Sequence, residues 1–199
     1  MNKFFIINGS GGSGKDTFVR MCEEIMNKYC EVNDLIYDYD YQVLNYSSVD
    51  LVKKAAKLLM GRYWDEENKT EKNRKFLSDL CDVWDSVNGR YLILRDMINS
   101  LNNTEYDWKC RVVFIHIREP EMIEVLQKEY PNIESLLILN NNIDHIKSNH
   151  ADAEVYNYKY DHVIDNSGSL EDLYSEAYIF ISKILKDLEE NKNENIQDK

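Results

Sequence analysis

The chain has 199 residues, of which 43% are apolar, so it is long enough to form one domain with a substantial core. It carries 24 basic and 36 acidic residues, which gives a net charge of −12. A protein this acidic repels phosphate backbones, and this excludes a broad nucleic-acid surface. A site for a phosphorylated ligand would have to be a local positive spot.

The four cysteines are Cys22, Cys30, Cys81 and Cys110, and none of them forms a CxxC pair. This spacing indicates reduced thiols rather than disulfides or a metal site. The apolar run near the N-terminus covers only residues 4–7, which is too short for a signal peptide, and no later run could span a bilayer. We therefore expect a soluble, cytoplasmic protein with no membrane partner.

Apolar periodicity predicts strands and helices that alternate along the chain. The expected strands cover residues 3–8, 41–46, 112–117, 135–139 and 162–164. The expected helices cover residues 16–29, 49–60, 70 onwards, 91–101, 119–130 and 169–188. This alternation is typical of a three-layer α/β/α domain with a mainly parallel sheet.

No linker or internal repeat divides the chain, so we expect a single domain over residues 1–188. Within this domain, a helical insertion at about 49–103 interrupts the alternation of strands and helices. Residues 189–199 are charged and rich in asparagine, which predicts a disordered tail.

A glycine-rich loop lies between the first predicted strand and helix. Gly9 and Gly14 are four residues apart, and Lys15 follows, which matches the spacing Gly-x-x-x-x-Gly-Lys of a nucleotide-binding P-loop. Backbone N–H groups of such a loop, the N-terminus of the helix and the lysine ammonium together bind the phosphates of a nucleoside triphosphate. The residues expected to bind it are Gly9, Gly11, Gly12, Ser13, Gly14, Lys15, Asp16 and Thr17.

The residue after Lys15 is Asp16, where many P-loops have a serine or threonine that binds Mg²⁺. Thr17 comes one position later, and the pattern Gly-Lys-x-Thr is found in small-molecule kinases. Thr17 would then contact the α-phosphate, and Asp16 would hold Mg²⁺ directly or through water. The alternative is that Asp16 is only an acid favoured by the helix dipole.

Residues 13–17 resemble the P-loop of the deoxynucleoside monophosphate kinases of phages and bacteria. Residues 69–80 resemble the charged stretch and helix on that family's acceptor side, and residues 160–170 resemble its last strand and turn. The resemblance implies a nucleotide-kinase-like P-loop NTPase fold with ATP and Mg²⁺ as cofactors. It also implies that Asn166 and Gly168, in the last turn, lie beside the adenine of ATP.

The chain departs from this family in two places. The strand over residues 112–117 has no acid where related enzymes place an aspartate that orients Mg²⁺, and His116 stands near that position. The segment at about 140–160, which corresponds to the family's lid, contains no arginine. Its basic and imidazole groups are Lys147, Lys159, His145 and His150.

Two arginines are candidates for binding the acceptor. Arg118 follows a predicted buried strand at the sheet edge where ligands of open α/β sheets bind, although it could instead pair with Glu119 or Glu121. Arg74 is assigned to the acceptor by the resemblance. We take Lys15 and Arg118 as the catalytic residues.

These observations predict an ATP-dependent kinase of nucleoside monophosphates, with deoxynucleotides as the expected acceptors. One alternative is a kinase of another small phosphorylated acceptor, such as phosphomevalonate or dephospho-coenzyme A. The other is a nucleotide-binding regulatory protein without activity, which the arginine-poor lid and the missing acid favour. The sequence leaves open whether the chain forms a homodimer.

Overall fold

The computed structural model describes residues 2–35, 40–64, 70–89, 91–103, 109–143 and 155–197. The chain divides into two compact units. The sheet unit spans Met1–Asn45 and Tyr106–Lys199, and the helical unit spans Tyr46–Glu105. The bounds of the helical unit are close to those of the helical insertion expected from the sequence at about 49–103.

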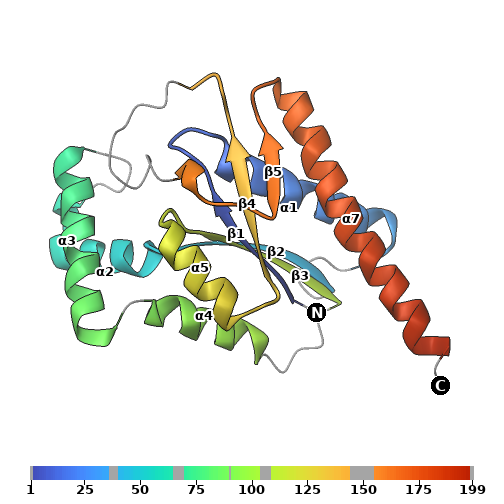
Figure 1. Ribbon diagram of the computed structural model, residues 1–199, viewed down its shortest axis with the longest axis horizontal. Coiled ribbons are helices and arrows are strands. Elements are labelled where there is room, and N and C mark those ends of the chain that lie inside the picture. The colour runs from blue at the N-terminus through green and yellow to red at the C-terminus, as the bar shows by residue number, and fades with distance from the viewer. Residues whose placement is uncertain are drawn as a thin grey trace. The chain divides into compact units, whose positions relative to one another are not determined.

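The sheet unit contains the strands and the helices that cover them (Figure 1). Its strands are β1 (Asn2–Asn8), β2 (Tyr41–Ser47, which runs into the helical unit), β3 (Cys110–His116), β4 (Ile133–Leu139) and β5 (His162–Asp165). Its described helices are α1 (Lys15–Val32), α5 (Pro120–Glu129), the 3-10 turn η2 (Val155–Asn157) and α7 (Leu170–Gln197).

The five strands form one parallel sheet in the order β2-β3-β1-β4-β5. β1 lies in the centre, and its Ile7 pairs with His116 of β3 and with Leu136 of β4. The strands are apolar almost throughout, as expected for a sheet that is buried on both faces. Their carboxyl ends meet at one edge, and there β1 passes into the glycine loop.

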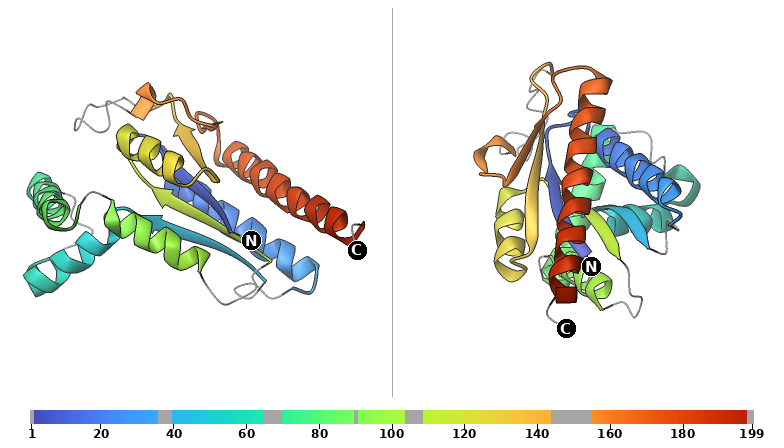
Figure 2. Two further views of the ribbon diagram at one scale, coloured as in Figure 1. Left: turned by 60° about the horizontal axis from the view of Figure 1, so that its bottom comes forward. Right: turned by 90° about the vertical axis from the view of Figure 1, so that its right-hand side faces the viewer.

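Helices cover both faces of this sheet, which confirms the expected three-layer architecture (Figure 2). α1 and α7 pack side by side on one face, and α5 covers β4 on the other. The core under α1 and α7 contains four phenylalanines, whose ring centroids lie 4.9 to 6.2 Å apart: Phe5, Phe18, Phe114 and Phe180. Fully burying a phenylalanine ring contributes on the order of 1.5–3 kcal/mol, and because Phe5, Phe18 and Phe114 are buried, this cluster holds α1 firmly against the sheet.

The helical unit contains α2 (Asp50–Met60), the 3-10 turn η1 (Gly61–Tyr63), α3 (Glu71–Asn88) and α4 (Leu92–Asn102). Thr70 is the N-cap of α3, and its hydroxyl accepts a hydrogen bond from the Asn73 N–H at 3.2 Å. The rings of Trp64 and Phe76 lie 5.9 Å apart and join the end of η1 to α3.

α7 differs from the expectation at its C-terminal end. Its start is a capping box, in which the Asp172 N–H donates to the Ser169 hydroxyl and the Ser169 N–H donates to the Asp172 carboxylate. The helix then continues to Gln197, through most of the segment for which the composition predicts a disordered tail. Extending a helix needs no new nucleus, and the glutamates and lysines in this segment are good helix formers.

No helix within the described part of the chain is long and apolar enough to cross a membrane. Some sequence predictions fall on residues outside the description. Residues 144–154, with His145, Lys147 and His150, are among them, and so is Lys69 at the start of the acceptor-side segment.

Candidate phosphate-binding site

The loop between β1 and α1 adopts the backbone conformation that its glycines permit. Gly9, Gly12 and Gly14 have positive φ angles of 152°, 81° and 97°. A Cβ atom at Gly9 would lie 2.5 Å from the Ser13 hydroxyl oxygen and 2.6 Å from the Ile138 carbonyl oxygen. The loop therefore curls tightly over the end of β4, and other residues would not fit at Gly9 or Gly14 without strain.

Lys15 is the first residue of α1, and its ammonium group turns back onto the loop. Its Nζ donates hydrogen bonds to the carbonyl oxygens of Gly9 at 2.6 Å and of Ser10 at 2.9 Å. The positive charge thus lies over the loop and at the N-terminal end of α1, where the helix dipole also favours an anion. In a protein of net charge −12, a phosphorylated ligand would need a local positive group of this kind.

The remaining loop residues differ in exposure. Gly11 and Gly12 are exposed, and Thr17 is half-buried in the first turn of α1. Ser13 is fully buried, and its Oγ has no hydrogen-bond partner among the described residues. A buried hydroxyl without a partner is unfavourable, and a phosphate oxygen could accept its hydrogen bond, so the loop suits an anionic ligand.

Asn166 joins the end of β5 to this loop. Its Nδ2 donates a hydrogen bond to the Ser13 carbonyl at 2.8 Å, and its backbone N–H donates to the Leu139 carbonyl at 2.6 Å. The turn after β5 is therefore packed against the glycine loop. Local packing explains why position 168 is a glycine, because a Cβ atom there would lie 2.5 Å from an Asp172 carboxylate oxygen in the α7 capping box.

Asp16 lies in the first turn of α1 beside the ends of β2 and β3. Its side chain is 90% exposed, and its Oδ1 lies 3.8 Å from Nε2 of His116. The same Nε2 lies 2.7 Å from Oδ1 of Asn45. His116 is thus half-buried next to the loop, at the end of β3.

The donor chemistry of Asp16 fits Mg²⁺, which prefers a carboxylate together with water and phosphate oxygens. Within the described ranges, no three histidine, cysteine, aspartate or glutamate side chains gather into a ready-made metal centre. Asp16 could therefore supply one carboxylate to Mg²⁺, and the remaining ligands would have to be water and phosphate oxygens.

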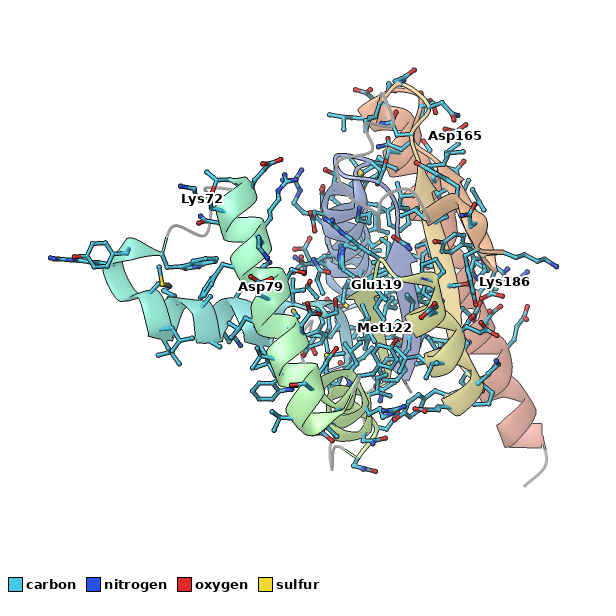
Figure 3. The ribbon with its side chains drawn as sticks, turned by 60° about the vertical axis from the view of Figure 1, so that its left-hand side comes forward. Lys72, Asp79, Glu119, Met122, Asp165 and Lys186 are labelled. Atoms are coloured by element: carbon cyan, nitrogen blue, oxygen red, sulfur yellow. The ribbon has the colours of Figure 1, made fainter. Side chains whose placement is uncertain are left out.

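The two candidate acceptor arginines belong to different units. Arg118 is exposed between β3 and α5, directly before Glu119, which Figure 3 labels at the start of α5. Arg74 is exposed in the first turn of α3, two residues after Lys72 in the same figure. Arg118 therefore shares the carboxyl edge of the sheet with the loop, whereas Arg74 is described within the helical unit alone.

Sequence reasoning missed three side chains around the loop. Asn8, at the end of β1, is fully buried, and its side-chain oxygen accepts a hydrogen bond from the Gly9 N–H. Tyr160 donates to the Val155 carbonyl at 2.8 Å, and burial raises the pKa of its phenol, which therefore stays protonated. Tyr156 in η2 lies with its hydroxyl 3.3 Å from the Ser10 hydroxyl. The one available signal was the polar Asn8 at the end of an apolar strand.

No protein-family model matches the chain, and no curated protein matches it in sequence. Among solved structures, it is similar to a sugar kinase from Janibacter sp. HTCC2649, with 12% identity and a TM-score of 0.40 over 92% of this chain and 95% of that one. It is also similar to a gluconokinase from Sinorhizobium meliloti 1021, with 11% identity and a TM-score of 0.40 over 94% and 96% of the two chains. A shikimate kinase from Aquifex aeolicus VF5 gives 14% identity and a TM-score of 0.38 over 96% and 98%. Likenesses this weak say nothing about which ligand the chain binds.

Proposed function

We propose that this protein is an ATP-dependent kinase that transfers the γ-phosphoryl group to a nucleoside monophosphate, with deoxynucleotides as the expected acceptors. The observation that carries this proposal is the position of Lys15. Its ammonium lies within 2.9 Å of two carbonyl oxygens of a loop whose glycines adopt positive φ angles, at the N-terminus of a helix. This combination is suited to the β- and γ-phosphates of a nucleotide.

The protein's part in such a reaction is positioning and charge neutralisation. ATP supplies the phosphoryl group, and Mg²⁺ neutralises charge on the phosphates. The loop N–H groups and Lys15 would hold the triphosphate, and Asp16 would hold the metal directly or through water. Asn166, which is bonded to the loop, supports the expectation that adenine lies against the turn after β5.

The acceptor side of the proposal depends on Arg118 and Arg74. Arg118 is exposed at the carboxyl edge of the sheet, where an acceptor phosphate could approach the donor. An arginine can bind a phosphate group through two parallel hydrogen bonds. Because a monophosphate acceptor is already an oxyanion, the reaction needs no strong general base.

Two alternatives remain from the sequence. A kinase of another small phosphorylated acceptor would use the same loop and the same arginines. A nucleotide-binding protein without activity is favoured by one observation, namely that the end of β3 carries His116 bonded to Asn45 rather than an acid. Both alternatives share the ATP site and differ only in what happens at the acceptor.

The deciding experiment offers the protein γ-labelled ATP, Mg²⁺ and one acceptor at a time. The panel contains the four deoxynucleoside monophosphates, the four ribonucleotides, phosphomevalonate and dephospho-coenzyme A. Label in a nucleoside diphosphate supports the proposal, and label in one of the other two compounds supports the first alternative. ATP binding without transfer to any acceptor would support the second.

A further inference from the structure

Asn8 occupies an unusual position for a polar side chain. It is the last residue of the central strand, it is 0% exposed, and its two strand predecessors are isoleucines. A buried carboxamide is unfavourable unless its donors and its acceptor find partners. The Asn8 side chain has three hydrogen-bond partners. Its Oδ1 accepts from the Gly9 N–H at 2.8 Å, and its Nδ2 donates to the Arg118 carbonyl at 3.1 Å and to the Tyr160 hydroxyl at 2.8 Å.

These bonds connect two ends of the proposed active site. The carbonyl of Gly9 accepts from the Lys15 ammonium at 2.6 Å, while its N–H is bonded to Asn8. The other end of the Asn8 carboxamide is bonded to the backbone of Arg118. A short path of hydrogen bonds therefore runs from the lysine of the phosphate loop to the backbone of the candidate acceptor arginine.

The chemistry of this position is selective for asparagine. Gly9 offers a donor, whereas Arg118 offers an acceptor, so the residue between them must both accept and donate. The Tyr160 hydroxyl donates to the Val155 carbonyl and can therefore only accept from Asn8. An apolar residue would lose all three of these bonds, and an ionised aspartate would place a negative oxygen beside the Arg118 carbonyl.

We propose that Asn8 is a positioning residue that sets the backbone of Arg118, and so its guanidinium, relative to the phosphate loop. This inference rests on the proposed function, in which Lys15 and Arg118 act on the two phosphates that react. Misplacing one such group by about 1 Å can cost about 100-fold in rate, even when each ligand still binds. Arg118 lies in the turn between β3 and α5, directly before Glu119, which is labelled in Figure 3.

The test uses the full chain with Asn8→Asp, which keeps the acceptor for Gly9 and removes the donors to Arg118 and Tyr160. The control is Asn33→Asp, at the exposed C-terminal end of α1. This variant removes a 2.8 Å hydrogen bond from the Asn33 Nδ2 to the Tyr29 carbonyl, at a position far along the chain from the loop. Tyr160→Phe serves if Asn8→Asp does not fold, because it removes one partner of Asn8 and keeps the ring. Two readouts are made, hydrogen exchange without ligand and kinetics with ATP and the four deoxynucleoside monophosphates.

We expect Asn8→Asp to speed amide exchange in peptides covering residues 117–122, while peptides covering residues 9–17 keep their protection. In the kinetics, kcat should fall about 10- to 100-fold with the ATP dissociation constant unchanged, and Tyr160→Phe should show a smaller loss of the same kind. Unchanged exchange at 117–122, or a loss of melting temperature with unchanged kcat, would overturn the positioning role. If the parent protein transfers phosphate to none of the eight nucleoside monophosphates of the panel above, the proposed function fails, and the exchange measurement alone decides the role of Asn8.

Discussion

The side-chain amide of Asn166 donates a hydrogen bond to the carbonyl oxygen of Ser13 at 2.8 Å, although 153 residues separate the two in sequence. The bond ties the turn after β5 to the glycine loop. It also fixes what can stand at Gly14, because a Cβ atom there would collide with the same Asn166 amide. The loop is thus shaped by the last turn of the sheet as well as by its own glycines.

Gly14→Ala should destabilise the protein by about 1–2 kcal/mol, because φ at this position is 97° and the added methyl would displace Asn166. The matched control is Gly11→Ala. Within the described part of the chain, a Cβ at Gly11 would meet nothing within 4 Å, and Gly11 has no positive φ. Urea unfolding of the two variants measures the difference. Equal unfolding midpoints for both would contradict the described geometry of the loop.

Asp161 should make the stability of the sheet unit depend on pH. Burial by itself raises the pKa of this carboxyl, but hydrogen bonds from Ser135 and Gln127 outweigh it and hold the pKa below its usual value. The stabilisation is therefore present above the unfolded pKa of about 3.9 and is lost as the pH falls through the folded pKa.

Asp161→Asn should accordingly lower the melting temperature at pH 7 by a few °C, about the effect of one net hydrogen bond in a chain of this size. The gap between variant and parent should shrink as the pH is lowered below about 4. Thermal melts at pH 7, 5 and 3.5 follow this gap. A gap that stays constant over this range would mean that ionisation of Asp161 contributes nothing.

Asp16→Ala tests the metal assignment. We expect the variant to need roughly 10-fold more Mg²⁺ for half-maximal transfer, because it loses a carboxylate ligand, while ATP binding without metal changes little or tightens slightly. His116→Ala is a useful comparison, since its Nε2 lies 3.8 Å from the Asp16 carboxylate without being a preferred Mg²⁺ ligand. Identical Mg²⁺ titrations of Asp16→Ala and the parent would reduce Asp16 to an acid favoured by the helix dipole.

Arg118→Ala and Arg74→Ala, made separately, should each raise the acceptor KM at least 10-fold with little change in ATP affinity. The loss of charge-assisted bonds to a phosphate is worth about 1.5–3 kcal/mol for each arginine. Arg20→Ala, at an exposed position on α1, is the control for removal of one positive charge. A variant that weakened ATP binding and left the acceptor kinetics intact would place that arginine on the donor side.

The sequence predicted the features that depend on local patterns. Apart from the 3-10 turn η2, each described strand and helix of the sheet unit begins near its expected place, because apolar runs and helical periodicity are strong over 3–8, 16–29 and 112–117. The spacing of Gly9, Gly14 and Lys15 located the loop, since glycine and lysine have few alternatives there.

Features that depend on tertiary contacts could not be predicted. Asn8 looked like the end of a strand, and both acceptors of its side-chain amide, the Arg118 carbonyl and the Tyr160 hydroxyl, are more than 100 residues away in sequence. The bond of His116 to Asn45 joins residues 71 positions apart and is invisible to any local pattern. The α7 extension to Gln197 was missed because composition measures polarity, which does not prevent an existing helix from continuing.

The most direct test of the account is calorimetric titration of ATP into the parent and into Lys15→Ala, each with Mg²⁺. The parent should bind ATP, and Lys15→Ala should bind it roughly 10- to 100-fold more weakly, because the charge-assisted contacts to the phosphates contribute about 1.5–3 kcal/mol. The control is Lys28→Ala, which removes a lysine from the same helix where it pairs with Glu24 at the surface. ATP affinity that is equal in the parent and in Lys15→Ala, or absent from the parent, would contradict the assignment of this loop as a nucleotide site.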